Sequence, residues 1–197
     1  AGDVGFSYLL HTLSDHGRSD IIYDMNSKYD VPGYGWQLAH GATALTESWQ
    51  AYKSVSNNHF MLGHLMEWFY SGIGGIRQSE SSVAFDDIII DPQIVGDLTS
   101  ASVSYESPHG TIRSEWKLEG DDYVLHVSIP ANTRASIYLP QDDANSISNF
   151  GMPISADKDM NFKAIAPGKS CVNVGSGDYQ FLMKNSKADG SASSHNK

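Results

Sequence analysis

The spacing of apolar residues changes near Ile76, and this change limits the fold more than any other feature of the chain. Before it, apolar residues recur at the i, i+3, i+4 and i+7 positions of a helix, as in Phe6, Leu9, Leu10 and Leu13. After it, apolar and polar residues alternate with a period of two, which is typical of strands. The chain is therefore predicted to be an α+β protein, with a helical part followed by a β-domain.

Three helices are predicted before the change of period. The first ends before Gly17, where a left-handed C-cap is expected, and the second runs from Ser19 through Met25. Because the link between them is so short, these two helices should be antiparallel neighbours. The third is predicted to start near Asn57 and to end at the glycines of 72–75. Its expected inward stripe is His59, Leu62, Met66, Phe69 and Ile73.

The β-domain is predicted to be an antiparallel sandwich, because many short runs are separated by turn signals at close intervals. The predicted strands are 85–90, 101–105, 112–118, 123–129, 135–139, 162–165, 170–174 and 179–183. Cys171 falls in one of these strands and is expected to be a buried, inert thiol. Trp49, Trp68 and Trp116 are assigned to cores. The predicted domains are 1–78 and 79–185, followed by a disordered tail of small and polar residues at 186–197.

Composition argues against several classes of function. The net charge of -10 and the absence of clustered Lys and Arg argue against nucleic-acid binding. The apolar run 62–73 is interrupted by His64, Glu67 and Ser71, so no membrane span is expected.

No metal site and no cofactor are predicted. The sequence contains no HExxH motif and no glycine-rich phosphate loop. Asp86 and Asp87 with Asp91, and Asp142 with Asp143, could hold calcium, but the preferred interpretation is that these acids are solvated loop residues.

Candidate functional residues gather between positions 32 and 68. The first stretch reads PGYGWQLAHGATALTESW (32–49), and the second reads SNNHFMLGHLMEW (56–68). A lone acid, Glu47, a lone imidazole, His59, and an aromatic ring, Trp36, are the parts of a sugar pocket, where rings stack on sugar faces and polar groups bind hydroxyls. Only half of such a pocket is present, so we expect Glu47 to face a cleft that this chain encloses in part.

The same residues resemble the C-terminal end of the α-L-rhamnosidases of glycoside hydrolase family 78. The resemblance covers roughly 140 residues in order. In the helical part it is carried by GDVG (2–5), LSDHG (13–17), PGYGW (32–36), GATALTESW (41–49), Asn58 with His59, and EWFY (67–70). In the β-domain it is carried by HGTI (109–112), Trp116 and IPANT (129–133).

This resemblance implies the last helices of an (α/α)6 barrel followed by a C-terminal β-sandwich, and hence a fragment of a longer polypeptide. It implies an inverting hydrolase of terminal L-rhamnose, with Glu47 as the general base and His59 as a sugar contact. Trp36 is assigned to substrate binding as a stacking platform. The general acid would lie in the upstream part of the polypeptide, so this fragment alone is expected to be inactive. The enzyme type also suggests a periplasmic or secreted location.

Several alternatives remain open. Thr46 and Ser48 stand where the family usually has a bulky aromatic and an arginine, and Trp36 stands where it often has tyrosine, so a relative that acts on another sugar fits as well. The sandwich could instead bind carbohydrate by itself, or serve as a purely structural domain. In the structural alternative, His59 and Trp36 would pack against protein.

Overall fold

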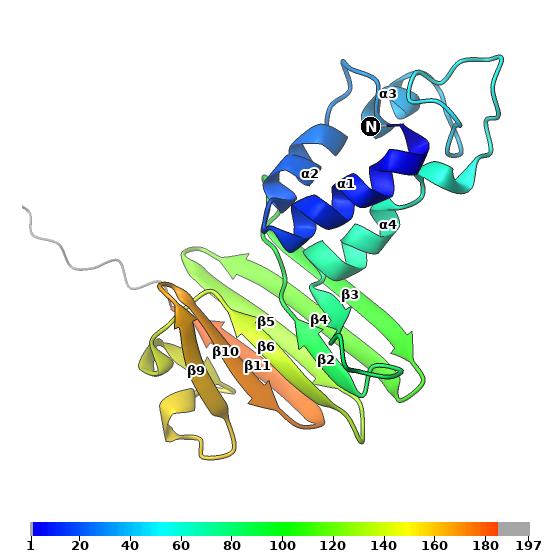
Figure 1. The fold of residues 1–197 in the computed structure, drawn as a ribbon. Helices are drawn as coiled ribbons and strands as arrows, with labels where there is room; N and C mark the ends of the chain where they lie inside the picture. Colours follow the sequence, from blue (N-terminus) through cyan, green and yellow to red (C-terminus); the bar gives the residue numbers. More distant parts are fainter. Residues whose placement is uncertain (1, 185–197) are drawn as a thin grey trace, which may run out of the picture.

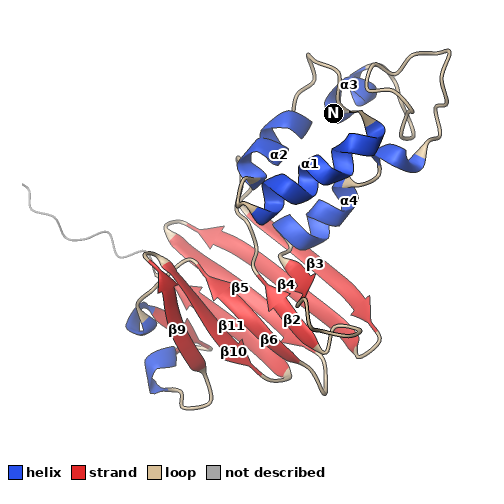
Figure 2. Cartoon of the chain, in the orientation of Figure 1, coloured by secondary structure: helices blue, strands red, loops and turns tan. Residues whose placement is uncertain are grey.

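Helices form the first part of the molecule and two β-sheets form the rest, as the change of period predicted (Figures 1 and 2). The computed structural model describes residues 2–184, so the predicted tail at 186–197 lies outside the described residues. The helical elements of the first part are α1 (Asp3–Asp15), α2 (Ser19–Asn26), α3 (Tyr34–Ala39), η1 (Phe60–Leu62), α4 (Leu65–Trp68) and the π-helical turn η2 (Phe69–Ile73).

The β-domain is a sandwich of a five-stranded and a six-stranded sheet. The first sheet has the order β1-β2-β6-β10-β9, and the second has the order β3-β4-β5-β11-β7-β8. Their bounds are β1 (Ile76–Gln78), β2 (Asp87–Ile90), β3 (Ser100–Ser107), β4 (Gly110–Glu119), β5 (Asp122–Ile129), β6 (Arg134–Leu139), β7 (Ile147–Asn149), β8 (Met152–Pro153), β9 (Asn161–Ala166), β10 (Lys169–Val174) and β11 (Gly177–Met183). Two short 3-10 turns, η3 (Ala144–Ser146) and η4 (Ile154–Ala156), flank β7 and β8.

The sandwich is antiparallel, as predicted, apart from one pair. β2 and β6 run parallel, with Ile88 opposite Ala135 and Ile90 opposite Ile137. The chain between them builds β3, β4 and β5 of the other sheet, and a crossover of this length is what allows two strands of one sheet to run parallel.

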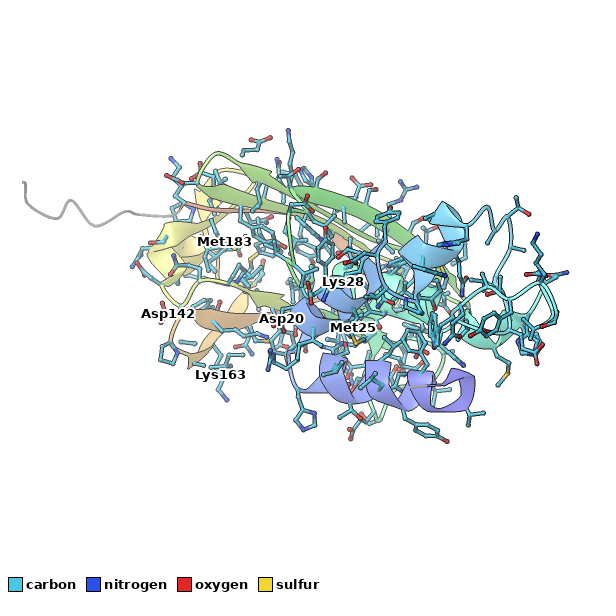
Figure 3. The ribbon with its side chains drawn as sticks, turned by 90° about the horizontal axis from the view of Figure 1, so that it is seen from above. Asp20, Met25, Lys28, Asp142, Lys163 and Met183 are labelled. Atoms are coloured by element: carbon cyan, nitrogen blue, oxygen red, sulfur yellow. The ribbon has the colours of Figure 1, made fainter. Side chains whose placement is uncertain are left out.

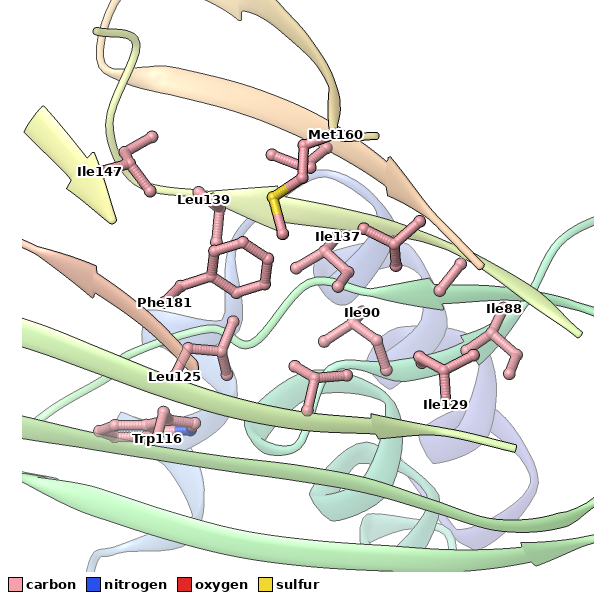
Figure 4. Packing of buried hydrophobic residues seen from close by; sticks show 14 of the residues in the cluster. Ile88, Ile90, Trp116, Leu125, Ile129, Ile137, Leu139, Ile147, Met160 and Phe181 are labelled. Carbon is pink, nitrogen blue, oxygen red and sulfur yellow. The ribbon is translucent and has the colours of Figure 1, made fainter. Parts of the chain in front are cut away.

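The sandwich core consists of the alternating residues that the sequence predicted. In β5, Tyr123, Leu125, Val127 and Ile129 are buried, while the residues between them are half-buried or exposed. Figure 4 shows the two inner faces meeting, with Ile90 and Ile137 opposite Leu125 and Phe181. Burial of this apolar surface is the main term that favours folding of the β-domain.

A second, smaller core holds the helical part together. Phe6 and Leu10 of α1 pack with Ile22 of α2 and Trp68 of α4. The indole N–H of Trp68 also donates to the buried hydroxyl of Ser19, at 2.8 Å. The assignment of Trp68 to a core is thus confirmed, and so are those of Trp116, 2 % exposed, and of Trp49, half-buried against this cluster.

The turn between α1 and α2 has the predicted left-handed glycine. Gly17 has a φ of 67°, and the Arg18 N–H donates to the Leu13 carbonyl at 2.7 Å, which closes the end of α1. Seen from above, Asp20 at the start of α2 lies nearer the sandwich than Met25 and Lys28 do (Figure 3). Helices α1 and α2 lie side by side, as their short link required (Figure 1).

The prediction of one long third helix from Asn57 was wrong. The segment divides into η1, α4 and η2, and its buried residues are Leu62, Trp68 and Gly72, whereas Met66 is 58 % exposed and Phe69 is 39 % exposed. His59 precedes the first turn in an extended conformation, with φ −131° and ψ 116°. The His59 N–H donates to the Leu45 carbonyl and not within a helical turn, so the local helical pattern did not determine the backbone here.

Several short elements were not predicted. Helix α3 falls in a glycine-rich stretch that was interpreted as a loop, and β1, β7 and β8 have three residues or fewer, too few to show a period. Strand β2 begins at Asp87 and not at Phe85. The domain ranges 1–78 and 79–185 remain a prediction. Strand β1 falls at the end of the first range, yet it pairs with β2 of the sandwich.

Direct contacts join the helical part to the sandwich. The indole N–H of Trp116 in β4 donates to the carbonyl of Ile73 in η2, at 2.8 Å. The Asp91 N–H donates to the Gly75 carbonyl at 2.9 Å, and the Gln93 N–H donates to the Gly72 carbonyl at 2.9 Å. The end of η2 is therefore held against both sheets.

Candidate functional site

The loop from residue 40 to residue 59 carries two of the three predicted site residues. Its two legs are paired by backbone hydrogen bonds, from the Glu47 N–H to the Ser56 carbonyl and from the His59 N–H to the Leu45 carbonyl, both at 2.9 Å. This pairing brings Glu47 and His59, which are separated by a polar segment in the sequence, onto facing legs of one loop.

Glu47 is exposed on this loop, and its carboxylate is held by one contact. Oε2 accepts a hydrogen bond from the Ser56 N–H at 3.0 Å. Within the described residues no hydrogen bond reaches Oε1. The carboxylate is therefore oriented by the opposite leg and keeps one oxygen open.

His59 is half-buried beside the loop. Its imidazole stacks on Phe60, with ring centroids 6.0 Å apart and an interplanar angle of 14°, and Phe60 is itself 82 % exposed. The Nδ1 atom is buried and has no hydrogen-bond partner among the residues that the structure describes. A buried imidazole nitrogen normally has a partner, so this atom marks a place where a further polar group fits.

Trp36 lies on α3 and reaches the same loop. Its indole N–H donates to the Gln50 carbonyl at 3.3 Å, three residues after Glu47. The imidazole of His40 stacks on the indole at 3.9 Å, with an interplanar angle of 24°. One face of Trp36 is thus covered by His40, so only the opposite face could serve as a stacking platform.

Aromatic residues anchor the loop to the helices. The ring of Trp49 lies 4.9 Å from that of Phe6 and 5.1 Å from that of Tyr34, both in edge-on arrangements. Thr46, 1 % exposed, donates its hydroxyl hydrogen to the Ser48 carbonyl at 2.6 Å. Glu47 therefore stands between two anchored neighbours, and sequence reasoning had identified Thr46 only as a departure from a family pattern.

Tyr34 offers a test of this anchoring. Its hydroxyl donates to the Leu62 carbonyl, and burial raises the pKa of the hydroxyl above its ordinary value of 10.0. The folded state holds this proton more tightly than the unfolded state. The contribution of the Tyr34 hydroxyl to the free energy of unfolding is therefore full at neutral pH and is lost as the pH rises above about 10. In urea titrations at pH 7, Tyr34→Phe should lower the free energy of unfolding by about 1 kcal/mol through the lost hydrogen bond.

The alkaline part of the test uses the same variant. Tyr34→Phe should lose less stability than the parent chain between pH 9 and pH 11, because it has no hydroxyl to ionise on unfolding. Equal losses in the two proteins would show that the Tyr34 hydroxyl is not the group that burial perturbs.

The acids considered for calcium are engaged in local contacts. Asp86 accepts from the Ser82 hydroxyl at 2.7 Å and the Val83 N–H at 3.0 Å, and these bonds lower the pKa of its carboxyl group. Asp143 binds the N–H of Asn145 in the same way, at 3.0 Å. Among residues 2–184, no cluster of three or more His, Cys, Asp or Glu side chains is arranged to hold a metal ion.

Two further expectations concern the Cys171 thiol and membrane-spanning helices. Cys171 is 9 % exposed in β10, and burial raises the pKa of its thiol, in agreement with the predicted inert thiol. No helix within the described part of the chain has the length and apolar character needed to cross a membrane.

Comparison with known protein families gives two adjoining matches. Residues 1–73 match the family described as the bacterial alpha-L-rhamnosidase 6 hairpin glycosidase domain, and residues 75–150 match the bacterial alpha-L-rhamnosidase C-terminal domain. The family assignment thus changes from one to the other between η2 and β1.

Individual relatives agree with these matches. The alpha-L-rhamnosidase of Streptomyces avermitilis is 28% identical over 192 residues, which cover 92% of this chain and 18% of that protein. Its crystal structure in complex with L-rhamnose has a TM-score of 0.81 over 93% of this chain and 18% of that one. The alpha-L-rhamnosidase structure from Dictyoglumus thermophilum has a TM-score of 0.80 at 26% identity over 93% of this chain and 21% of that one. The chain spans about a fifth of the length of the curated relatives that it matches.

Proposed function

Because the chain belongs to the bacterial alpha-L-rhamnosidase family, we propose that it forms the C-terminal part of a glycoside hydrolase that releases terminal L-rhamnose from glycosides. It supplies the last helices of the six-hairpin domain and the β-sandwich that follows them. The rest of the six-hairpin domain, in the upstream part of the polypeptide, would complete the pocket.

The hydrolysis proceeds with inversion, and Glu47 acts as its general base. An inverting glycosidase uses one carboxylate to take a proton from water and a carboxylic acid, roughly 6.5–9.5 Å away, to protonate the leaving oxygen. The open Oε1 of Glu47 is the observation that carries this proposal, because the hydrogen bond from the Ser56 N–H to Oε2 orients the carboxylate and leaves Oε1 free to receive the proton. The general acid comes from the upstream part.

His59 and Trp36 contact the sugar. The buried Nδ1 of His59 lacks a partner within the described residues, and a sugar hydroxyl or an upstream side chain would provide one. Trp36 offers one indole face, since His40 covers the other. His59 lies on the loop that presents Glu47, and the Trp36 indole N–H donates to the same loop, so all three side chains belong to one local unit.

The helical part also has exposed apolar side chains that suit contact with further helices. Tyr8, Leu38, Phe60 and Met66 are all more than half exposed. Four large apolar side chains exposed on so small a helical unit favour a protein–protein interface. The family membership supports the upstream helical hairpins as the part that covers them.

Two measurements test the function. The polypeptide that includes the upstream part should release rhamnose from an aryl α-L-rhamnoside, and proton NMR during the first minutes should show the β-anomer, the product of inversion. The 197-residue chain alone should release none, since it lacks the acid. An α-anomer as first product would remove the inverting mechanism, and rhamnose release by the chain alone would show that the acid lies within it. An inactive longer polypeptide would favour a non-catalytic role.

A further inference from the structure

A cavity of about 590 Å³ lies where the helical part meets the sandwich. Its walls come from α1, from α4 and η2, and from β1, β3 and the turn before β2. None of its lining residues belongs to the loop 40–59 or to α3. The cavity therefore shares no lining residue with the candidate active site.

One wall of the cavity is aromatic. The ring centroid of Tyr105 lies 4.7 Å from that of Phe85 and 6.4 Å from that of Tyr70. Tyr70 and Tyr105 are 38 % and 37 % exposed, which is high for large rings in contact. Their hydroxyls make no hydrogen bond to any described residue. The wall thus offers ring faces and unused hydroxyl groups to whatever enters the cavity.

The backbone next to Phe85 has an unusual conformation. Ala84 and Phe85 have φ values of 57° and 65°, a region that side-chain-bearing residues rarely occupy. The Phe85 N–H is held by the side-chain oxygen of Gln78 at 2.9 Å, and Gln78 also lines the cavity. Strained residues of this kind are concentrated at binding and catalytic sites, where the surrounding structure enforces them.

Polar and charged side chains also line the cavity, and Asp15, Glu67 and Arg77 together give it a net negative charge. Glu67 Oε2 lies 3.0 Å from His11 Nε2, and the carboxylate of Asp15 makes no hydrogen bond or ion pair to any described residue. Arg77 also lines the cavity, but its guanidinium group contacts Asp91 at 3.2 Å. This charge disfavours anions, whereas carboxylates are good acceptors for neutral hydroxyl groups.

We propose that this junction cavity is a second binding site, which takes a neutral saccharide of one or two rings. A sugar ring would stack on Tyr105 and Tyr70, and its hydroxyls would donate to Asp15 and Glu67. The volume lies within the usual range of small-molecule sites. The choice of sugar as ligand rests on the proposed function, whereas the site itself rests on the geometry of this chain.

The test is a titration of the ¹⁵N-labelled 197-residue chain with methyl α-L-rhamnopyranoside and, separately, with a rhamnosyl-glucose disaccharide, followed by amide chemical shifts. Shifts should appear at the C-terminal half of α1, in β1 and around Tyr105. Tyr105→Ala should weaken binding about tenfold, because it removes a stacking ring. Asp15→Asn, at an exposed helix position, should weaken it without disturbing the fold. Tyr29→Ala is the matched control, since this exposed tyrosine does not line the cavity.

The outcomes separate the site from the active site. No shifts at millimolar sugar, or shifts confined to the loop 40–59, would overturn the junction site and leave the proposed hydrolase untouched. Binding that survives in both Tyr105→Ala and Asp15→Asn would also overturn it. Glu47→Gln should leave sugar binding in the junction cavity unchanged, because Glu47 does not line it. An inactive hydrolase together with sugar-dependent shifts at the junction would therefore overturn the proposed function and support this site.

Discussion

Glu47→Gln in the polypeptide that includes the upstream part is expected to lower kcat by about 100- to 10,000-fold, the usual contribution of a general base. The amide cannot accept the proton of the attacking water. It can still accept the Ser56 N–H through its oxygen, so the pairing of the two loop legs should persist. KM should change little, because the reaction loses proton transfer and not sugar binding.

Glu80→Gln is the matched control for this variant. Glu80 is exposed in the turn between β1 and β2, far along the chain from the loop 40–59, and the same loss of charge there should leave kcat unchanged. Both variants are compared with the parent by initial rates on an aryl rhamnoside and by circular dichroism. A change in kcat of less than about tenfold for Glu47→Gln would remove Glu47 from the mechanism.

Gly75→Ala is expected to lower the free energy of unfolding by about 3 kcal/mol, through a conformational cost and a steric cost. Gly75 has a φ of 69°, which costs roughly 1–2 kcal/mol for alanine. An added Cβ would also lie 2.2 Å from the Pro92 nitrogen and 2.3 Å from the Asp91 carbonyl carbon. Both are backbone atoms, so they can give way only by shifting the joint between η2 and the sandwich, and overpacking of this kind typically adds about 1–3 kcal/mol.

Gly120→Ala separates the two causes. Gly120, between β4 and β5, has a φ of 65°, but an added Cβ would have no atom within 4 Å. The free energy of unfolding should therefore fall only by the conformational cost, roughly 1–2 kcal/mol. Urea titrations of both variants, followed by fluorescence and by circular dichroism, measure the difference. Equal losses would show that the close approach at Gly75 is not costly.

The sandwich could be predicted well because its signal is local and repeated. Alternation in β4, β5 and β6 identifies Trp116, Leu125 and Ile137 as inward residues, and each is at most 2 % exposed. Two inner faces of this kind can bury their apolar surface only against each other. The parallel pairing of β2 with β6 was not predicted, because strand direction depends on the path of the chain between the two strands. The strands β1, β7 and β8 were also missed, because they are too short to show a period.

The helical region before Ile76 could be predicted only in part. A spacing of three and four residues from His59 to Ile73 indicated one long helix, yet the His59 N–H bonds to Leu45 and the segment is broken near Gly63. An added Cβ on Gly63 would lie 2.9 Å from the Phe60 carbonyl oxygen, so the break also requires a residue without a side chain. A hydrogen bond to a distant residue outweighed the local pattern.

The sequence by itself determined the two-part architecture, the inward residues of the strands, the Gly17 turn and the family, because periodicity and local motifs reside in neighbouring residues. Only the tertiary structure decided how the loop 40–59 is paired, which oxygen of Glu47 stays open and that aromatic and acidic side chains surround a cavity at the junction. The loop features arise from hydrogen bonds between the two legs of one loop, which no periodic pattern records. The cavity exists only when the helical part and the sandwich have folded against each other.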